Sequence, residues 1–174
     1  MIKALPKQYQ WLNAEPGPKM LLEALKLHGT LEVVGEKDNP EILAWAKELD
    51  LHQYTHDSTP WCGLFAAITA KRAGKSVVQE PLWAANWLKF GLESPPELGA
   101  IAVFSREGGN HVGIYVGEDS THYHILGGNQ KDSVSIVRIA KDRCRGFRAQ
   151  YQSKPANVRK VILSSTGEVS TNEA

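Results

Sequence analysis

The spacing of the apolar residues changes once along this chain, near Gly99, and this change limits the folds open to it. Four segments before Gly99 carry apolar side chains at helical spacing. Five segments after it are short, β-rich and separated by turn residues, which indicates strands. Helices followed by an antiparallel meander predict an α+β domain. The expected helices are 18–29, 39–51, 58–75 and 80–91, and the expected strands are 99–106, 111–119, 121–128, 133–140 and 144–151.

The two ends of the chain differ from this central part. Residues 1–17 are mixed in character, with prolines and a glycine near their end, and predict a loosely packed N-terminal arm. Residues 153–174 are polar apart from Val158 and Val161–Leu163, so we expect a tail that is disordered or loosely attached. The folded domain is therefore expected over residues 18–152.

Composition excludes several classes of protein. A chain of 174 residues is long enough for one sizeable core. Its 20 basic and 19 acidic residues give a net charge of +1, and no dense basic stripe is visible, which argues against a nucleic-acid partner. No segment has the apolar length of a membrane span, and the first 19 residues lack the apolar core of a signal peptide. We expect a monomer that is made in the cytoplasm without a signal peptide and does not insert into a membrane.

Cys62 is the residue with the clearest chemical meaning. The sequence "STPWCGLF" places it in the first turn of the helix over 58–75, with Thr59 or Ser58 as the expected cap and Pro60 at the first helical position. The unpaired N–H groups and partial positive charge of a helix start favour a thiolate and can also stabilise an oxyanion. The alternative is a buried, inert thiol. Cys144 is the only other cysteine, so free thiols are favoured over a disulfide framework.

A thiolate nucleophile needs a histidine that acts as base and then as acid. His111 opens the strand over 111–119 after the loop "REGGN", where a side chain is both held and accessible. His56, six residues before Cys62, is a more loosely held alternative. The next strand and its end supply His124, Asn129 and Gln130 as groups that could orient the imidazole. An amide oxygen would give the Cys-His-Asn arrangement of papain-like sites.

These segments resemble the NlpC-type and CHAP cysteine peptidases, small papain-like enzymes that mostly cleave peptidoglycan. The resemblance rests on "TPWCGLFAA", "ELGAIAVFSR", "HVGIYVGED" and "HILGGNQ", and it covers roughly residues 18–150. The segments "NPEILAWAKEL" and "WAANWLKFG" are similar to a phage-associated branch of that superfamily. The resemblance implies a papain-like fold, with the N-terminal helices packed on a small antiparallel sheet.

The resemblance also assigns roles to residues. Cys62 matches the nucleophile and His111 the base. Asn129 matches the asparagine that CHAP enzymes use to orient the base, whereas His124 lies at the distance where NlpC-type enzymes often place a histidine. We favour Asn129, because the two preceding glycines leave room around the base. The glutamate that CHAP enzymes place before this asparagine is a glycine here.

Other features point to no cofactor and no metal site. The acidic segments lack the ligand alternation of a calcium loop, and the histidines lack zinc-ligand spacing. Trp61 and Trp83 suit either a sugar- or peptide-binding groove or the core, and tryptophans in such helices are more often core residues.

The expected function is therefore hydrolysis of an amide bond in the peptide of peptidoglycan, as in an endolysin. The enzyme would be an endopeptidase or an N-acetylmuramoyl-L-alanine amidase, acting on the cell wall after release or delivery. The alternatives are an interbacterial cell-wall amidase toxin with the same chemistry and a non-catalytic phage tail or structural protein on the same fold.

Overall fold

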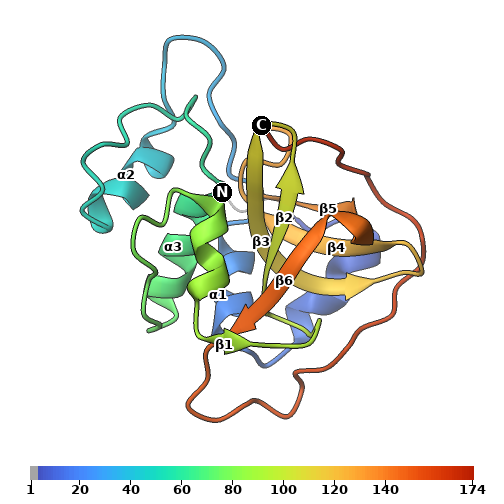
Figure 1. Cartoon of the computed structure of the whole chain (residues 1–174). Helices are drawn as coiled ribbons and strands as arrows, with labels where there is room; N and C mark the ends of the chain where they lie inside the picture. Colours follow the sequence, from blue (N-terminus) through green and yellow to red (C-terminus); the bar gives the residue numbers. More distant parts are fainter. Residues whose placement is uncertain (1–3) are drawn as a thin grey trace.

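The computed structural model describes residues 4–174 and packs short helices against one antiparallel sheet (Figure 1). The expected α+β class is confirmed. The helical segments are η1 (Lys7–Ala14), α1 (Lys19–Lys26), α2 (Pro40–Glu48), α3 (Cys62–Arg72), η2 (Ala84–Lys89) and η3 (Lys141–Arg143). The strands are β1 (Leu92–Glu93), β2 (Ile101–Arg106), β3 (Gly109–Glu118), β4 (His122–Gly127), β5 (Ser135–Ala140) and β6 (Cys144–Ala149), in the sheet order β1-β6-β2-β3-β4-β5.

Local sequence explains the helix starts only in part. α2 begins as expected, with the Asn39 side chain accepting from the Glu41 N–H at 2.8 Å and Pro40 at the first position. α3 begins later than expected: the N-cap is Trp61 rather than Thr59 or Ser58, and Cys62 is the first helical residue. The segment expected as a helix over 80–91 is the 3₁₀ helix η2.

The sheet buries both of its faces. On β2, Ile101 and Val103 belong to the large core shared with the helices, whereas Ala102 and Phe104 belong to a second apolar cluster. Aromatic side chains fill that second cluster, with Tyr123 and Phe147 at a ring-centroid distance of 5.0 Å. The helices and the second cluster therefore hold the sheet rigidly from two sides.

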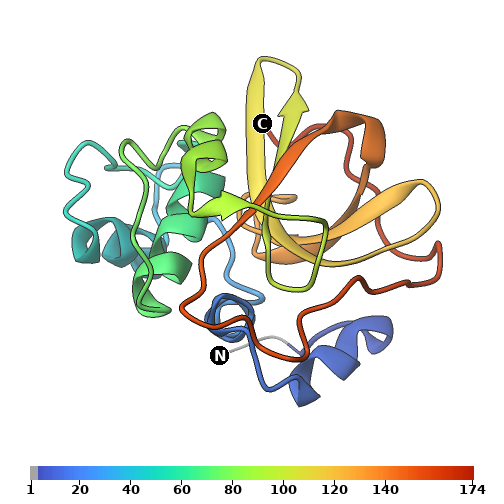
Figure 2. The same cartoon turned by 60° about the horizontal axis from the view of Figure 1, so that its bottom comes forward.

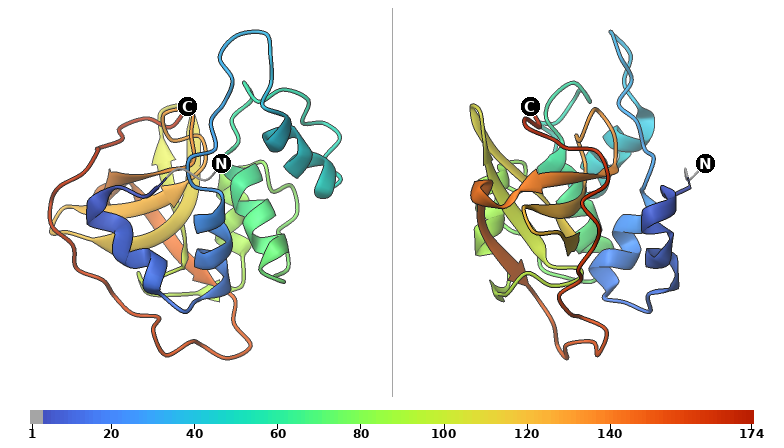
Figure 3. Two further views of the ribbon diagram at one scale, coloured as in Figure 1. Left: turned by 180° about the vertical axis from the view of Figure 1, so that it is seen from behind. Right: turned by 90° about the vertical axis from the view of Figure 1, so that its right-hand side faces the viewer.

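The sequence predicted a loosely packed arm, but the part of the arm that the structure describes is packed against the domain. η1 buries Tyr9 and Leu12 in the large core, and Figure 3 shows η1 and α1 covering the sheet from behind. Glu15, at the end of η1, pairs with Arg159 at 2.8 Å. The arm is thus a structural part of the domain.

The C-terminal strap, which we define as residues 150–174, also differs from expectation. It runs around the sheet and returns to the end of the β2–β3 hairpin (Figures 1 and 3), and Figure 2 shows it passing the N-terminal helices. Backbone hydrogen bonds join it to strand β3 at Glu118 and to strand β5 at Arg138. Polar composition led us to expect disorder, but the strap is anchored by main-chain bonds to strand edges, which any sequence can make.

Among the helices within residues 4–174, none has the length and apolar character needed to cross a membrane.

Candidate active site

The helix start places Cys62 at the edge of the core. The Trp61 side chain is buried, and its indole N–H donates to the Glu32 carboxylate at 3.1 Å. Within residues 4–174, no side chain at the N-cap position bonds to the first turn of α3. Gly63 is required at the next position, because a Cβ there would lie 2.2 Å from the Pro81 carbonyl oxygen. The first turn of α3 therefore keeps N–H groups that the helix itself does not pair, next to the thiol.

The structure brings His111 to Cys62, as the sequence predicted. His111 lies on β3, paired with Phe104 of β2, and is fully buried. Its ring lies beside the Cys62 thiol, close enough that each group shifts the pKa of the other. The ring nitrogen Nδ1 has no conventional hydrogen-bond partner among residues 4–174, and Nε2 is used elsewhere, so Nδ1 is the nitrogen available to the thiol.

Gln130 orients the imidazole. Its Oε1 is 2.9 Å from His111 Nε2. Its amide nitrogen donates to the carbonyl oxygens of Ile125 and Ser135, at 3.1 and 2.6 Å. Two carbonyl acceptors fix which end of the amide is the nitrogen, so the oxygen faces His111 and accepts from Nε2–H. This leaves Nδ1 of the neutral ring without a proton, ready to accept one from the thiol.

Asn129, which we had expected in this role, is directed elsewhere. Its side-chain amide donates to the backbone oxygen of Glu173 at 3.0 Å. Asn129 lies beyond the end of β4 and adopts a left-handed backbone with φ of 59°, which directs its side chain away from His111. The absence of a side chain at Gly127 leaves room beside the base, and the Gln130 amide fills it: a Cβ at Gly127 would lie 2.5 Å from Gln130 Oε1 and 3.4 Å from His111 Nε2. Asparagine tolerates a left-handed backbone better than most residues do, and this tolerance was the local signal for the turn, although it does not show which amide meets His111.

The pKa shifts describe a coupled thiol and imidazole. Burial acts to raise the pKa of the Cys62 thiol, but His111, the Val112 backbone and Arg106 together outweigh it, and the pKa is lowered. Burial acts to lower the pKa of His111, but Cys62, Glu173 and Gln130 outweigh it, and the pKa is raised. Both shifts favour the thiolate–imidazolium pair, which is the reactive form of such a site.

His124, the alternative third residue, belongs to a different cluster. It pairs with Gly117 on β3. Gly117 is six residues from His111 on the same strand, which is about 20 Å along it. The His124 Nδ1 is 2.7 Å from the Tyr9 hydroxyl and its Nε2 is 2.8 Å from Asp119, so both ring nitrogens are engaged. His56, the other alternative base, is exposed and pairs with Asp38 at 3.2 Å. Neither histidine is part of the Cys62 site.

A cavity of about 500 Å³ opens next to Cys62. Segments on three sides line it: the approach to α3, the start of η2 and the tip of the β2–β3 hairpin. Trp83 lines the cavity with 70% of its surface exposed, whereas Trp61 is buried; the core interpretation therefore holds for Trp61 and fails for Trp83. The lining residues are Gln53, Tyr54, Thr59, Pro60, Cys62, Glu80, Leu82, Trp83, Ala84, Ala85, Arg106, Gly108, Gly109 and Asn110.

Arg106 holds the hairpin tip that forms one wall of this cavity. Its side chain donates to the backbone oxygens of Glu107 and Asn110, at 2.9 and 3.2 Å. The side-chain oxygen of Asn110, the residue directly before His111, accepts from Arg145 at 3.0 Å. The loop before His111 is thus fixed by arginine contacts, although it contains two glycines.

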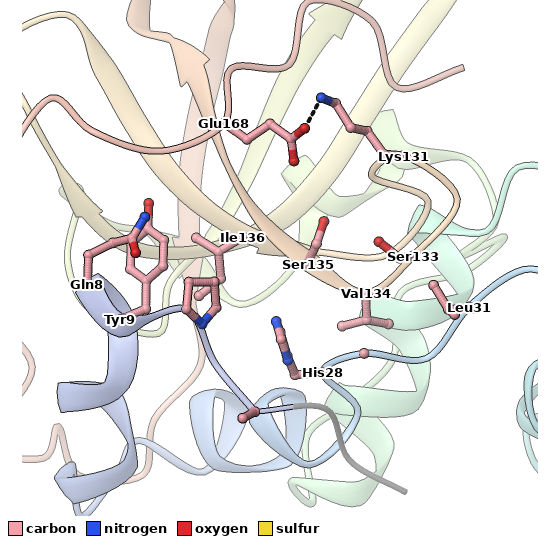
Figure 4. A pocket seen from close by; sticks show the side chains of 13 residues that line it. Gln8, Tyr9, His28, Leu31, Lys131, Ser133, Val134, Ser135, Ile136 and Glu168 are labelled. Atoms are coloured by element: carbon pink, nitrogen blue, oxygen red, sulfur yellow. Dashed lines mark hydrogen bonds and ion pairs between the residues drawn. The ribbon is translucent and has the colours of Figure 1, made fainter.

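A second cavity, of about 300 Å³, lies between η1, the end of α1 and the start of β5 (Figure 4). Figure 4 shows Tyr9, His28 and Ser135 around it and the Lys131–Glu168 ion pair near its rim. Neither Cys62 nor His111 lines it. It holds no nucleophile of the kind found in the first cavity.

The remaining sequence expectations concern metals and the second thiol. Within residues 4–174, no three His, Cys, Asp or Glu side chains are grouped so that they could hold a metal ion. Cys144 is a free, half-buried thiol, and burial raises its pKa. Cys62 is therefore the thiol whose surroundings favour ionisation.

Comparison of the chain with protein-family models, with curated proteins and with solved structures finds no match.

Proposed function

We propose that this protein is a papain-like cysteine hydrolase that cleaves an amide bond in the peptide of peptidoglycan. The observation that carries the proposal is the Cys62–His111–Gln130 arrangement beside an open cavity: a thiol at a helix start, and an imidazole fixed by a neutral amide. The resemblance of "TPWCGLFAA", "HVGIYVGED" and "HILGGNQ" to NlpC-type and CHAP peptidases supplies the substrate class.

The proposed reaction has two steps. The Cys62 thiolate attacks the amide carbonyl carbon, and N–H groups at the start of α3 stabilise the negative oxygen. His111 gives its Nδ1 proton to the leaving amine as the C–N bond breaks, which leaves a thioester. His111 then takes a proton from water, whose oxygen attacks the thioester; the acid is released, and the Cys62 thiolate and the protonated His111 are restored. Gln130 keeps the ring oriented through both proton transfers.

The cavity suits a substrate that is partly apolar and partly charged. Trp83 offers a flat aromatic face to a sugar ring or a peptide side chain. Glu80 and Arg106 place opposite charges on the lining, which suits a peptide that carries both ammonium and carboxylate groups. Such a hydrolase would act on the cell wall after release or delivery.

Digestion of purified sacculi tests the proposal. The full chain should clear sacculi in zymograms, and mass spectrometry of the released fragments should identify the broken amide. Cys62→Ala should be inactive and Cys144→Ala active, because only Cys62 lies beside His111. A wild-type protein that folds, labels at Cys62 and releases no fragment would overturn the hydrolase and favour a non-catalytic protein on this fold.

A further inference from the structure

Glu173, in the C-terminal strap, is a buried carboxylate that the proposed reaction does not yet use. It is 2% exposed, although it lies in a segment of polar composition. Carboxylates are rarely buried to this extent unless they are paired. Its position therefore needs a reason beyond the packing of a polar tail.

Contacts on three sides hold Glu173 against the candidate site. Its backbone oxygen accepts from Asn129, the residue directly before Gln130. Its carboxylate pairs with Arg143 of η3, and Ser170 of the strap donates to the same carboxylate. Arg143 is itself anchored, with Nε donating to the Ser105 carbonyl oxygen at 2.9 Å.

These contacts bring Glu173 near the imidazole. Ser105 follows Phe104, which pairs with His111, and Gln130 bonds to His111 directly. Burial has the largest effect on the pKa of His111 and acts to lower it. Cys62 and then the Glu173 carboxylate act to raise it, and the net pKa is raised. In turn, burial acts to raise the pKa of Glu173, but Arg143, His111 and Ser170 outweigh it, so the carboxylate stays ionised.

We propose that Glu173, carried to the site by the C-terminal strap, is a positioning residue whose carboxylate stabilises the charged imidazolium form of His111. The imidazolium is the acid that protonates the leaving amine, so the strap completes the electrostatics of the site. Gln130 fixes the direction of the ring without adding charge, and Glu173 supplies the charge without touching the reacting atoms. The catalytic meaning rests on the proposed function; the electrostatic assignment does not.

The charged groups around the pair come from four parts of the fold. Cys62 of α3 and Glu173 of the strap are the negative groups that act on His111. Arg106, at the end of β2, acts on Cys62, and Arg143 of η3 acts on Glu173. Because Arg143 partly neutralises Glu173, the experiment must separate the carboxylate from the guanidinium.

NMR titration of the His111 ring in the full chain provides the test, since it needs no turnover. Glu173→Gln keeps the size of the side chain and the backbone bond to Asn129 but removes the charge. The imidazolium-to-imidazole ratio of His111, measured above its pKa, should fall roughly three- to tenfold, which corresponds to a half to one pKa unit. Glu168→Gln is the matched control, because Glu168 lies on the same strap but is exposed and pairs with Lys131.

A double variant separates the two charges. In Glu173→Gln with Arg143→Gln, both members of the ion pair are neutral, and the His111 pKa should stay below that of the wild type. A return to the wild-type value would show that an unpaired Arg143 caused the shift, and it would overturn the proposal. An unchanged His111 pKa in Glu173→Gln alone would overturn it as well.

A measurement on the unaltered protein covers the case in which Glu173→Gln fails to fold. The ¹³C resonance of the Glu173 carboxylate should show an inflection at the pKa of His111, because the two groups sense each other's charge. A Glu173 resonance that stays flat through the titration of His111 would contradict the proposal. If these tests succeed while sacculi remain intact, the hydrolase fails and the electrostatic assignment stands.

Discussion

Two buried histidines on neighbouring strands, His111 and His124, have opposite surroundings. At His111, one ring nitrogen is held by the Gln130 amide and the other faces the Cys62 thiol beside an open cavity. At His124, Tyr9 and Asp119 engage both nitrogens. The first ring has one nitrogen facing the thiol, whereas the second has both nitrogens bonded, one to Tyr9 of the arm and the other to Asp119 after β3.

The pKa directions separate the two sites in the same way. The pKa of His111 is raised by Cys62, Glu173 and Gln130 against the effect of burial. Burial, the largest effect, lowers the pKa of His124, and Arg138 acts in the same direction. The Asp119 carboxylate that bonds to His124 also bonds to Arg138 at 2.8 Å, so it is already paired with a permanent cation. A buried histidine with a carboxylate partner is therefore not by itself a catalytic site.

Substitution of the reactive pair should give the largest effect. Cys62→Ala and His111→Ala should each lower turnover on sacculi on the order of 10³-fold or more, because each removes a group that takes part in bond making or proton transfer. His124→Ala should retain turnover wherever the variant is folded, as judged by circular dichroism. A folded His124→Ala variant that is as inactive as His111→Ala would remove the distinction between the two sites.

Asp119→Ala should show its effect in stability. Breaking a buried pair costs on the order of 3–5 kcal/mol, because Arg138 and His124 lose their common partner. We expect the free energy of unfolding in urea to fall by about this amount, with sacculus cleavage retained below the melting temperature. Glu168→Ala, which breaks an exposed ion pair, is the control and should change stability by less than about 1 kcal/mol.

The same carboxylate should also set part of the acid stability. Burial acts to raise the pKa of Asp119, but Arg138, the Thr121 N–H and His124 outweigh it, and the folded-state pKa lies well below its usual range. A lowered pKa stabilises the fold above the unfolded value of about 4, and this stability is lost as pH falls toward the folded-state pKa. Unfolding free energies of the wild type and Asp119→Asn should therefore converge below about pH 4, and parallel curves would contradict this.

Gln130→Ala sharpens the assignment of the orienting residue. Loss of the amide frees the His111 ring, so kcat should fall on the order of 10- to 10³-fold, which is less than the roughly 10²–10⁴-fold that a positioned acid–base group itself contributes. Asn129→Gly, which keeps the left-handed backbone and removes the contact with Glu173, should lose much less. If Asn129→Gly is the more damaging change, Gln130 is not the residue that orients the base.

Trp83→Ala should give the smallest effect and identify the substrate wall. An exposed aromatic face contributes about 0.5–1.5 kcal/mol, so KM should rise about two- to tenfold with kcat unchanged. Trp83→Phe should restore most of the affinity. Thermal stability should not change, because Trp83 is exposed. A loss of kcat without a change in KM would place Trp83 outside substrate binding.

The sequence was sufficient for features that depend on neighbours along the chain. The apolar periods separated helices from strands, and the cap at Asn39 followed from its side chain and the proline after it. The helix start marked Cys62, because local backbone sets the properties of that position. His111 was chosen as an accessible residue that opens a strand, but it is the third residue of β3 and is fully buried. These features were enough to predict the α+β class and two of the three residues that meet at the candidate site.

Tertiary structure alone decided the rest. The left-handed backbone of Asn129 turns the chain so that Gln130 and not Asn129 meets His111, and the two preceding glycines do not say which of the two amides reaches the ring. The strap looked disordered because most of its side chains are polar, but backbone bonds to β3 and β5, the Arg159–Glu15 ion pair, the buried Val161 and the buried Glu173 carboxylate anchor it. The strap binds where the folded sheet has unpaired backbone groups and where Arg143 offers a charge to Glu173. Such binding positions exist only in the folded chain, so the sequence alone does not reveal them.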